Sequence, residues 1–293
     1  MGVPGSGKTM LARRLPGILP RMSLEESLEV TRIYSVAGLL GERASLIQTR
    51  PFRAPHQGVS IAGLIGGGTG VARPGEISLA HFGVLFMDEL TLFKRDVLES
   101  LRGPVEEGVV RIARSGGVVS YPSRFSLIAA MNPCPCGYLG DDKRRCECGY
   151  LEIQRYLARL SGPLLDRFDV FCDVGRLGKD ELLGPPDGAT SSEMRKVVES
   201  ARAIQTERYG SGGRTNATAS RSEVLAAGGM ADNAWRLLGH GVEEGTLSGR
   251  GVDRAIRVAR TIADLREGDG ISEEDMGAAL SMRFLQRDHG QAA

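Results

Sequence analysis

Apolar positions in the first half of the chain predict buried strands. Residues 83–89 form a continuous apolar run of strand length that ends in Asp88 and Glu89. A run without polar alternation is typical of a strand covered on both faces, as in a parallel sheet. Further strands are predicted over 125–131 and 169–174, with a β-hairpin over 109–121 around a glycine turn.

Elsewhere the apolar spacing is that of helices. Ser23 is the expected N-cap of a helix over 23–35, because Glu26 completes a capping box with it. The first helix is expected to begin in a glycine-rich loop and end near Pro16. The other predicted helices cover 94–107, 150–160, 193–209, 220–228, 231–245, 248–267 and 272–286.

The order of these elements predicts two domains. Strands alternate with helices over 1–176, a linker rich in Gly, Pro and Ser covers 177–192, and the remainder over 193–293 is helical. This order is typical of an α/β nucleotide-binding core followed by an all-helical lid.

Composition narrows the class of protein. The 293 residues are 25% charged and 41% hydrophobic with a net charge of +1, as in ordinary globular proteins. No global basic field favours nucleic acid, so any DNA contact must come from local patches. Since no run of 18 apolar residues occurs, we expect no membrane partner and a cytoplasmic location.

The N-terminal residues carry a phosphate-binding loop. In the pattern G-x4-G-K-T, backbone N–H groups wrap a phosphate, the lysine bridges phosphate oxygens and the threonine binds Mg²⁺. The residues predicted to bind ATP are Gly2, Pro4, Gly5, Ser6, Gly7, Lys8 and Thr9. Asp88 is the second expected Mg²⁺ ligand, and Glu89 the residue that orients or deprotonates the attacking water.

Three further polar residues are candidates for catalysis. Asn132 follows the strand over 125–131, where its side chain could contact the γ-phosphate, although Asn-Pro is also an ordinary turn. Arg167 is either a finger that reaches a neighbouring subunit's ATP or a local ion-pair partner of Asp166 or Asp169. Arg250, at the start of a lid helix, is either a second such contact or a solvated side chain.

Four stretches resemble the ComM/YifB branch of the magnesium-chelatase-like AAA+ ATPases. They are GVPGSGKTMLARRLPGILP, RPGEISLAHFGVLFMDEL, AAMNPCPCGYLG with CEC, and SGPLLDRFDV with RVARTIADL. The resemblance implies an AAA+ core with a helical lid, ATP hydrolysis at subunit interfaces and a hexameric ring. It assigns Asn132 as sensor 1, Arg167 as the arginine finger and Arg250 as sensor 2.

The resemblance also bears on the substrate. ComM-like proteins imply helicase-like branch migration of DNA, with the insert near 50–80 and the hairpin facing the pore. The related chelatase subunit implies remodelling of a protein or metallo-cofactor partner instead. This chain departs from the family pattern at Gln57, where a second histidine is usual, and at Thr91 and Leu92, where Pro-Glu is usual.

Four cysteines lie close together in the sequence. Cys134, Cys136, Cys146 and Cys148 could supply four thiolates to a tetrahedral Zn²⁺, with the three basic residues 143–145 offsetting its charge. Reduced free thiols and a redox pair are the alternatives. The hairpin residues Arg111 and Arg114 would contact DNA phosphates in a ring pore, or else serve only solubility.

The chain starts where a P-loop is ordinarily preceded by a strand. Met1 directly precedes Gly2, so the first strand of the core is expected to be missing and its neighbours to lose backbone partners, at about 1–3 kcal/mol for each buried group. We therefore hypothesise a truncated chain that binds nucleotide poorly and assembles no active ring. An inactive fragment is thus a third alternative for its function.

Overall fold

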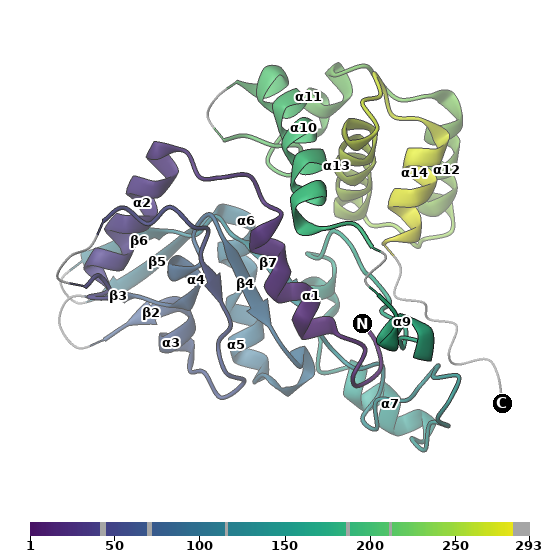
Figure 1. The fold of residues 1–293 in the computed structure, drawn as a ribbon, viewed down its shortest axis with the longest axis horizontal. Coiled ribbons are helices and arrows are strands. Elements are labelled where there is room, and N and C mark those ends of the chain that lie inside the picture. Colours follow the sequence, from purple (N-terminus) through teal and green to yellow (C-terminus); the bar gives the residue numbers. More distant parts are fainter. Residues whose placement is uncertain (42–44, 69–71, 115–116, 186–187, 211–212, 284–293) are drawn as a thin grey trace. The chain divides into compact units, whose positions relative to one another are not determined.

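The computed structural model describes residues 1–41, 45–68, 72–114, 117–185, 188–210 and 213–283 (Figure 1). The chain forms two compact units. The α/β unit comprises Met1–Arg167 and Asp173–Pro186, and the helical unit comprises Phe168–Cys172 and Asp187–Ala293. A short segment that precedes the predicted linker therefore belongs to the helical unit.

The α/β unit contains short helices and strands. Its helices are α1 (Lys8–Arg14), α2 (Leu24–Val36), α3 (Ile61–Ile65), α4 (Glu76–Leu79), α5 (Arg95–Ser100), α6 (Arg102–Glu107), α7 (Tyr150–Leu157), α8 (Gly162–Leu165) and α9 (Lys179–Leu183), with 3-10 turns η1 (Leu15–Gly17) and η2 (Leu90–Leu92). Its strands are β1 (Phe52–Arg53), β2 (Gly66–Gly67), β3 (Arg73–Pro74), β4 (Val84–Met87), β5 (Val109–Arg114), β6 (Gly117–Pro122) and β7 (Ser126–Ala129).

A parallel sheet forms the centre of the α/β unit. Its order is β1-β4-β7, and β4 is paired from Val84 to Met87 with β7. All four residues of β4 are buried, as the continuous apolar run predicts. Ala12 of α1 packs in the same apolar cluster as Phe86. This arrangement confirms the predicted α/β class with a parallel sheet.

The first two residues of the chain are bonded to the segment that follows β7 and to Val174. The N–H of Gly2 donates to the carbonyl of Met131 at 3.3 Å, and the N–H of Val174 donates to the carbonyl of Met1 at 2.7 Å. Gly2 and Val174 also form a parallel bridge. Met1 and Gly2 thus bond to a neighbour on each side, and the predicted loss of backbone partners does not occur at Met131 and Val174.

Two predicted elements differ from those observed. The helix predicted over 94–107 is divided into α5 and α6, because Pro104 has no N–H to bond the carbonyl of Ser100 and its ring crowds that carbonyl. The strand predicted over 169–174 is reduced to the bridge at Val174, and Cys172 within this stretch is exposed. The capping box of Ser23 and Glu26 is confirmed.

The helical unit is built around one helix. Its elements are α10 (Ser191–Tyr209), α11 (Arg221–Ala226), α12 (Asp232–Glu243), α13 (Gly249–Leu265) and α14 (Glu273–Ser281). Figure 1 shows α13 between α10 and α14, and its buried face joins residues such as Ile256 and Met276 in one apolar cluster. The helical character predicted after the linker is confirmed.

A saturated polar network lies inside this unit. The Asp264 side chain is fully buried and accepts hydrogen bonds from side chains on α10, α13 and the segment before α11: Gln205 (3.2 Å), Arg208 (2.7 Å), Asn216 (2.7 Å) and Arg260 (3.0 Å). Arg260, also buried, donates to the carbonyls of Ala227, Gly268 and Asp269 as well. The network therefore satisfies a buried ion pair within one unit.

The segment Phe168–Cys172 is attached to the helical unit by its own bonds. The N–H of Phe171 donates to the carbonyl of Met282 at 2.6 Å, and Arg283 donates to the carbonyl of Phe168 at 2.7 Å. Asp169 forms an ion pair with Arg254. Among the described helices of the whole chain, none is both long and apolar enough to cross a membrane.

Candidate nucleotide site

The glycine-rich loop adopts a backbone that its sequence requires. Gly5 has φ of 79° and Gly7 has φ of 83°, in the left-handed region that other residues rarely enter. A Cβ on Gly2 would lie 2.3 Å from the carbonyl oxygen of Val174. Because α1 begins at Lys8, directly after Gly7, its first N–H groups border this loop.

Lys8 connects the loop to the end of β7. Its Nζ donates to the carbonyls of Gly2 at 2.7 Å and Val3 at 2.8 Å, and to the Oδ1 of Asn132 at 3.3 Å. Burial lowers the pKa of Lys8, and the charges of two nearby carboxylates, Asp88 and Glu89, oppose that shift. The predicted phosphate-binding lysine and the predicted sensor thus lie in direct contact.

Thr9 connects the loop to the end of β4. Its Oγ1 donates to the Oδ2 of Asp88 at 2.9 Å. Hydroxyl and carboxylate oxygens are the ligands that Mg²⁺ prefers. Within the described residues, the buried Ser6 hydroxyl has no hydrogen-bond partner. An unsatisfied hydroxyl in a glycine loop, three residues before the threonine of a hydroxyl–carboxylate pair, fits a magnesium–triphosphate group.

Glu89, the residue predicted to act on the attacking water, has an unusual backbone conformation. It is exposed and has φ of 52° and ψ of 54°, an unusual backbone for a residue other than glycine. Its Oε2 accepts a hydrogen bond from the Nε2 of Gln57 at 2.6 Å. Sequence reasoning did not identify Gln57 as a partner of Glu89. In the sequence, Gln57 is notable only because the family usually has histidine at this position.

The two candidate arginines differ in environment. Arg167 is buried, forms an ion pair with Glu106 at 2.9 Å and donates to the carbonyl of Pro163 at 2.6 Å. For Arg167 to act as an arginine finger, its ion pair with Glu106 would have to break. Arg250 is exposed in the first turn of α13, in the helical unit. Both catalytic assignments stay predictions.

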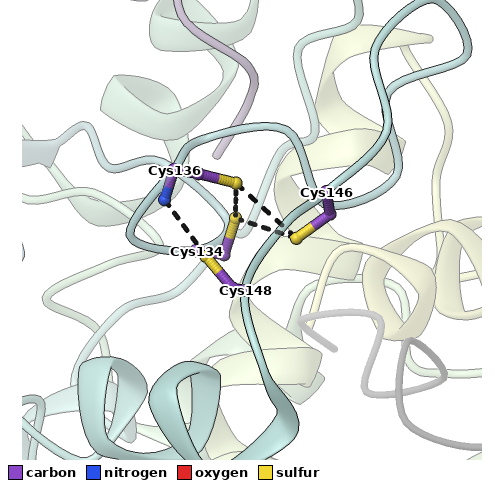
Figure 2. Close-up of side chains that lie close together, drawn as sticks. All are labelled: Cys134, Cys136, Cys146 and Cys148. Atoms are coloured by element: carbon purple, nitrogen blue, oxygen red, sulfur yellow. Dashed lines mark hydrogen bonds between the residues drawn. The ribbon is translucent and has the colours of Figure 1, made fainter.

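The four clustered cysteines converge on one point. Their sulfur atoms all lie within 4.8 Å of one another, and the Sγ atoms of Cys134, Cys136 and Cys146 are 3.4–3.7 Å apart (Figure 2). The N–H of Cys136 donates to the Sγ of Cys148 at 3.3 Å. In this arrangement the cluster could hold a metal ion.

Backbone donors tune these thiols unequally. Burial raises the pKa of Cys136, but hydrogen bonds from the N–H groups of Tyr138 and Glu147 and from the thiols of Cys134 and Cys148 outweigh it and lower the pKa to about 6. Burial raises the pKa of Cys148 to about 12. Hydrogen-bond donation thus favours the thiolate form of Cys136, which is the form that binds metals.

The hairpin of β5 and β6 carries both arginines proposed for phosphate contact, and the structure describes the side chain of one of them. Arg111 is exposed and forms an ion pair with Glu107. Val118 on the opposite strand is 65% exposed. The turn residues Ser115 and Gly116 and the side chain of Arg114 lie outside the described part of the chain.

Comparison with known proteins agrees with these features. The family model of the magnesium chelatase subunit ChlI matches residues 1–182, and that of the ChlI C-terminal region matches residues 188–283. The chain is 47% identical over 285 residues to an uncharacterized protein of Mycobacterium tuberculosis, covering 96% of this chain and 56% of that protein.

Two named relatives are similarly close. Competence protein ComM of Haemophilus influenzae is 42% identical over 291 residues, and the uncharacterized protein YifB of Escherichia coli is 40% identical over 293 residues. Each match covers 98% of this chain, which spans about half the length of these relatives, 55% and 56% respectively. From the fold, the loop and these matches together, the chain belongs to the magnesium chelatase ChlI family, with ComM and YifB among its relatives.

Proposed function

We propose that this protein binds and hydrolyses ATP as an AAA+ ATPase. The observation that supports this most directly is the pair of contacts Lys8–Asn132 and Thr9–Asp88. Each joins the glycine loop to the carboxyl end of a parallel strand, where α/β folds bind their ligands. The unsatisfied Ser6 hydroxyl supports a phosphate as that ligand.

In the proposed reaction each side chain has a distinct task. Lys8 and the loop N–H groups bind phosphate oxygens, and Thr9 with Asp88 holds Mg²⁺, which when bound offsets charge on the phosphates. Glu89 accepts the proton of a water molecule that attacks the γ-phosphorus, while the bond from that phosphorus to the bridging oxygen breaks and ADP leaves. Asn132 orients the water or a γ-phosphate oxygen.

We further propose that the protein works as a homo-hexamer in the cytoplasm. Arg167 would then act on the ATP of a neighbouring subunit after its pair with Glu106 opens, and Arg250 would act as the second sensor. DNA is the proposed polymer, supported by the resemblance to the ComM group, by the relative named a competence protein and by the exposed Arg111. The family model's description as a chelatase subunit supports the alternative, a protein or metallo-cofactor partner.

Zn²⁺ is the proposed ion of the cysteine cluster. Four thiolates bind Zn²⁺ tetrahedrally with Zn–S bonds of about 2.3 Å, which places the sulfur atoms about 3.8 Å apart. The sulfur separations of 3.4–3.7 Å for three of the cysteines are close to this value. A disulfide would need about 2.05 Å.

Substitution of Lys8 tests ATP binding. We expect Lys8→Ala to lower Mg²⁺-dependent ATP turnover by about 10²–10³-fold, because one preorganised charge that contacts the phosphates is removed. Phosphate release and the Kd of a fluorescent ATP analogue would be measured, with the exposed Lys94→Ala as the matched control. Lys8→Ala protein that turns over ATP as the wild type does would refute the proposal.

DNA stimulation separates the two substrate classes. We expect single-stranded DNA to raise ATP turnover. The double variant Arg111→Ala with Arg114→Ala should reduce the salt dependence of DNA binding by about one unit of slope for each phosphate that is no longer neutralised. Arg95→Ala, on the exposed surface of α5, is the control. If DNA does not change the rate of ATP turnover, the alternative of a protein or metallo-cofactor partner is favoured.

A further inference from the structure

The cysteine cluster lies directly against the glycine loop. Gly137, which follows Cys136, has φ of 87°, and a Cβ there would lie 2.6 Å from the Cγ of Pro4 and 3.7 Å from the Cγ of Asn132. Its N–H donates to the carbonyl of Cys134 at 3.0 Å, which closes the turn between these cysteines. The first arm of the cluster is therefore in van der Waals contact with the P-loop.

The second arm returns to the same residue. Cys148 is followed by Gly149, the N-cap of α7. From α7, the hydroxyl of Tyr156 donates to the carbonyl of Asn132 at 3.2 Å. Since Asn132 stands two residues before Cys134, both arms of the cluster fix the segment that contacts Lys8.

Among the described residues, the other interactions that close the loop between the arms are local hydrogen bonds and pairs that involve exposed arginines. Arg176 pairs with Asp141 at 2.6 Å, and Arg144 lies 4.1 Å from the ring centre of Tyr138. The arginine of each pair is exposed to solvent, which screens its charge and limits its contribution to stability, although the Asp141 side chain is only 2% exposed. The binding free energy of a metal ion held by four thiolates is larger than the contribution of such pairs. Metal binding can therefore stabilise the ordered conformation of the surrounding chain.

We infer that Zn²⁺ bound by Cys134, Cys136, Cys146 and Cys148 holds Asn132 and Gly137 in position against the P-loop, so that Zn²⁺ binding and ATP binding strengthen each other. The inference rests on the proposed ATP binding. Coupling between two sites is reciprocal, so each ligand changes the affinity of the other by the same factor, and we expect that factor to be about tenfold.

The first test measures both directions of this coupling. In excess Mg²⁺, a zinc-selective chelator removes Zn²⁺ from the purified protein, and the Kd of a fluorescent ATP analogue is measured before and after. A chromogenic zinc indicator then measures Zn²⁺ affinity with and without the analogue. We expect one Zn²⁺ per chain and the same factor, about tenfold, in both measurements. Protein whose cluster holds no Zn²⁺ or forms a disulfide overturns the inference.

Two variants separate the metal from its contact. Cys148→Ser should lose Zn²⁺ and bind the analogue more weakly, with exposed Cys172→Ser as the control. Gly137→Ala should keep Zn²⁺ but bind the analogue more weakly, because its Cβ meets Pro4. Gly38→Ala is the matched control, since Gly38 has φ of 73° and open space around its Cβ position. Gly137→Ala protein with wild-type nucleotide affinity overturns the inference.

The failure of this inference differs from failure of the ATPase proposal. If the zinc-loaded wild type binds no ATP analogue, the proposed function is wrong and the coupling is refuted with it. If it binds the analogue equally well with and without Zn²⁺, the ATPase proposal stands and only the coupling is refuted.

Discussion

Glu89 and Asp264 are carboxylates in opposite environments. Glu89 is exposed, has a left-handed backbone and accepts a hydrogen bond from a single glutamine side chain. Asp264 is fully buried, lies in a helix and accepts hydrogen bonds from four side chains. Asp264 has its acceptor capacity filled and therefore stabilises the fold, whereas the oxygens of Glu89 stay accessible, as its proposed role in catalysis requires.

The largest expected effect is on turnover. Glu89→Gln should lower kcat by about 10²–10⁴-fold, because the amide cannot accept the proton of the attacking water. The Kd of the ATP analogue and the free energy of unfolding should change little. The exposed Glu243→Gln is the control. If the Kd rises in step with the fall in kcat, Glu89 serves in binding and the contrast with Asp264 weakens.

At Asp264 the expected effect is on stability instead. Asp264→Ala should lower the free energy of unfolding by about 3–5 kcal/mol, because it leaves the buried Arg260 charge without its partner. Urea unfolding followed by circular dichroism measures this. Asp264→Asn keeps one acceptor oxygen, so its free energy of unfolding should lie between those of Asp264→Ala and the wild type.

The same carboxylate makes stability depend on pH. Burial raises the pKa of Asp264, but hydrogen bonds from Arg208 and Asn216 outweigh it and lower the pKa below its ordinary value of about 3.9. Because the folded-state pKa is the lower one, this stability is present above about pH 4 and is lost as pH falls through the folded-state value. Asp264→Asn should show a smaller loss on acidification. An equal loss in both proteins would assign the acid sensitivity to other groups.

The smallest expected effect is at Gln57, a positioning residue. Gln57→Leu should lower kcat by about 10–10²-fold with little change in KM, since a hydrogen bond to a charged group is worth about 1.5–3 kcal/mol. Gln57→His introduces another N–H donor and should restore much of the rate. A shift of the acidic limb of the kcat–pH profile in Gln57→Leu would confirm action through Glu89. A rise in KM alone would place Gln57 in substrate binding.

Local patterns predicted the elements better than they predicted the site. The capping box at Ser23 and the buried β4 follow from spacing alone, because their determinants are neighbours in sequence. The division of the helix over 94–107 could also have been predicted from Pro104. The helical spacing of the apolar residues across this stretch led instead to the prediction of one continuous helix.

Contacts between distant residues could not be predicted in this way. Gln57 lies in an irregular segment, 32 residues before Glu89 in the sequence. No helical or strand periodicity predicts that these two side chains are in contact. Gly137 lies against Pro4 because two loops pack together, which only the folded chain determines. Sequence reasoning identified the candidate chemistry at Lys8, Thr9 and Asp88, while the neighbours that orient it came from the structure.

The segment Phe168–Cys172 makes the helical unit discontinuous in sequence. A polypeptide excised from α10 to α14 would contain every described helix of that unit, yet it would lack the segment that bonds Met282, Arg283 and Arg254. Such a fragment would expose a surface shaped for five residues encoded before the linker. The helical unit is thus built from two separate stretches of one chain. A polypeptide designed to contain the complete unit has to include the segment Phe168–Cys172 as well as the residues after the linker.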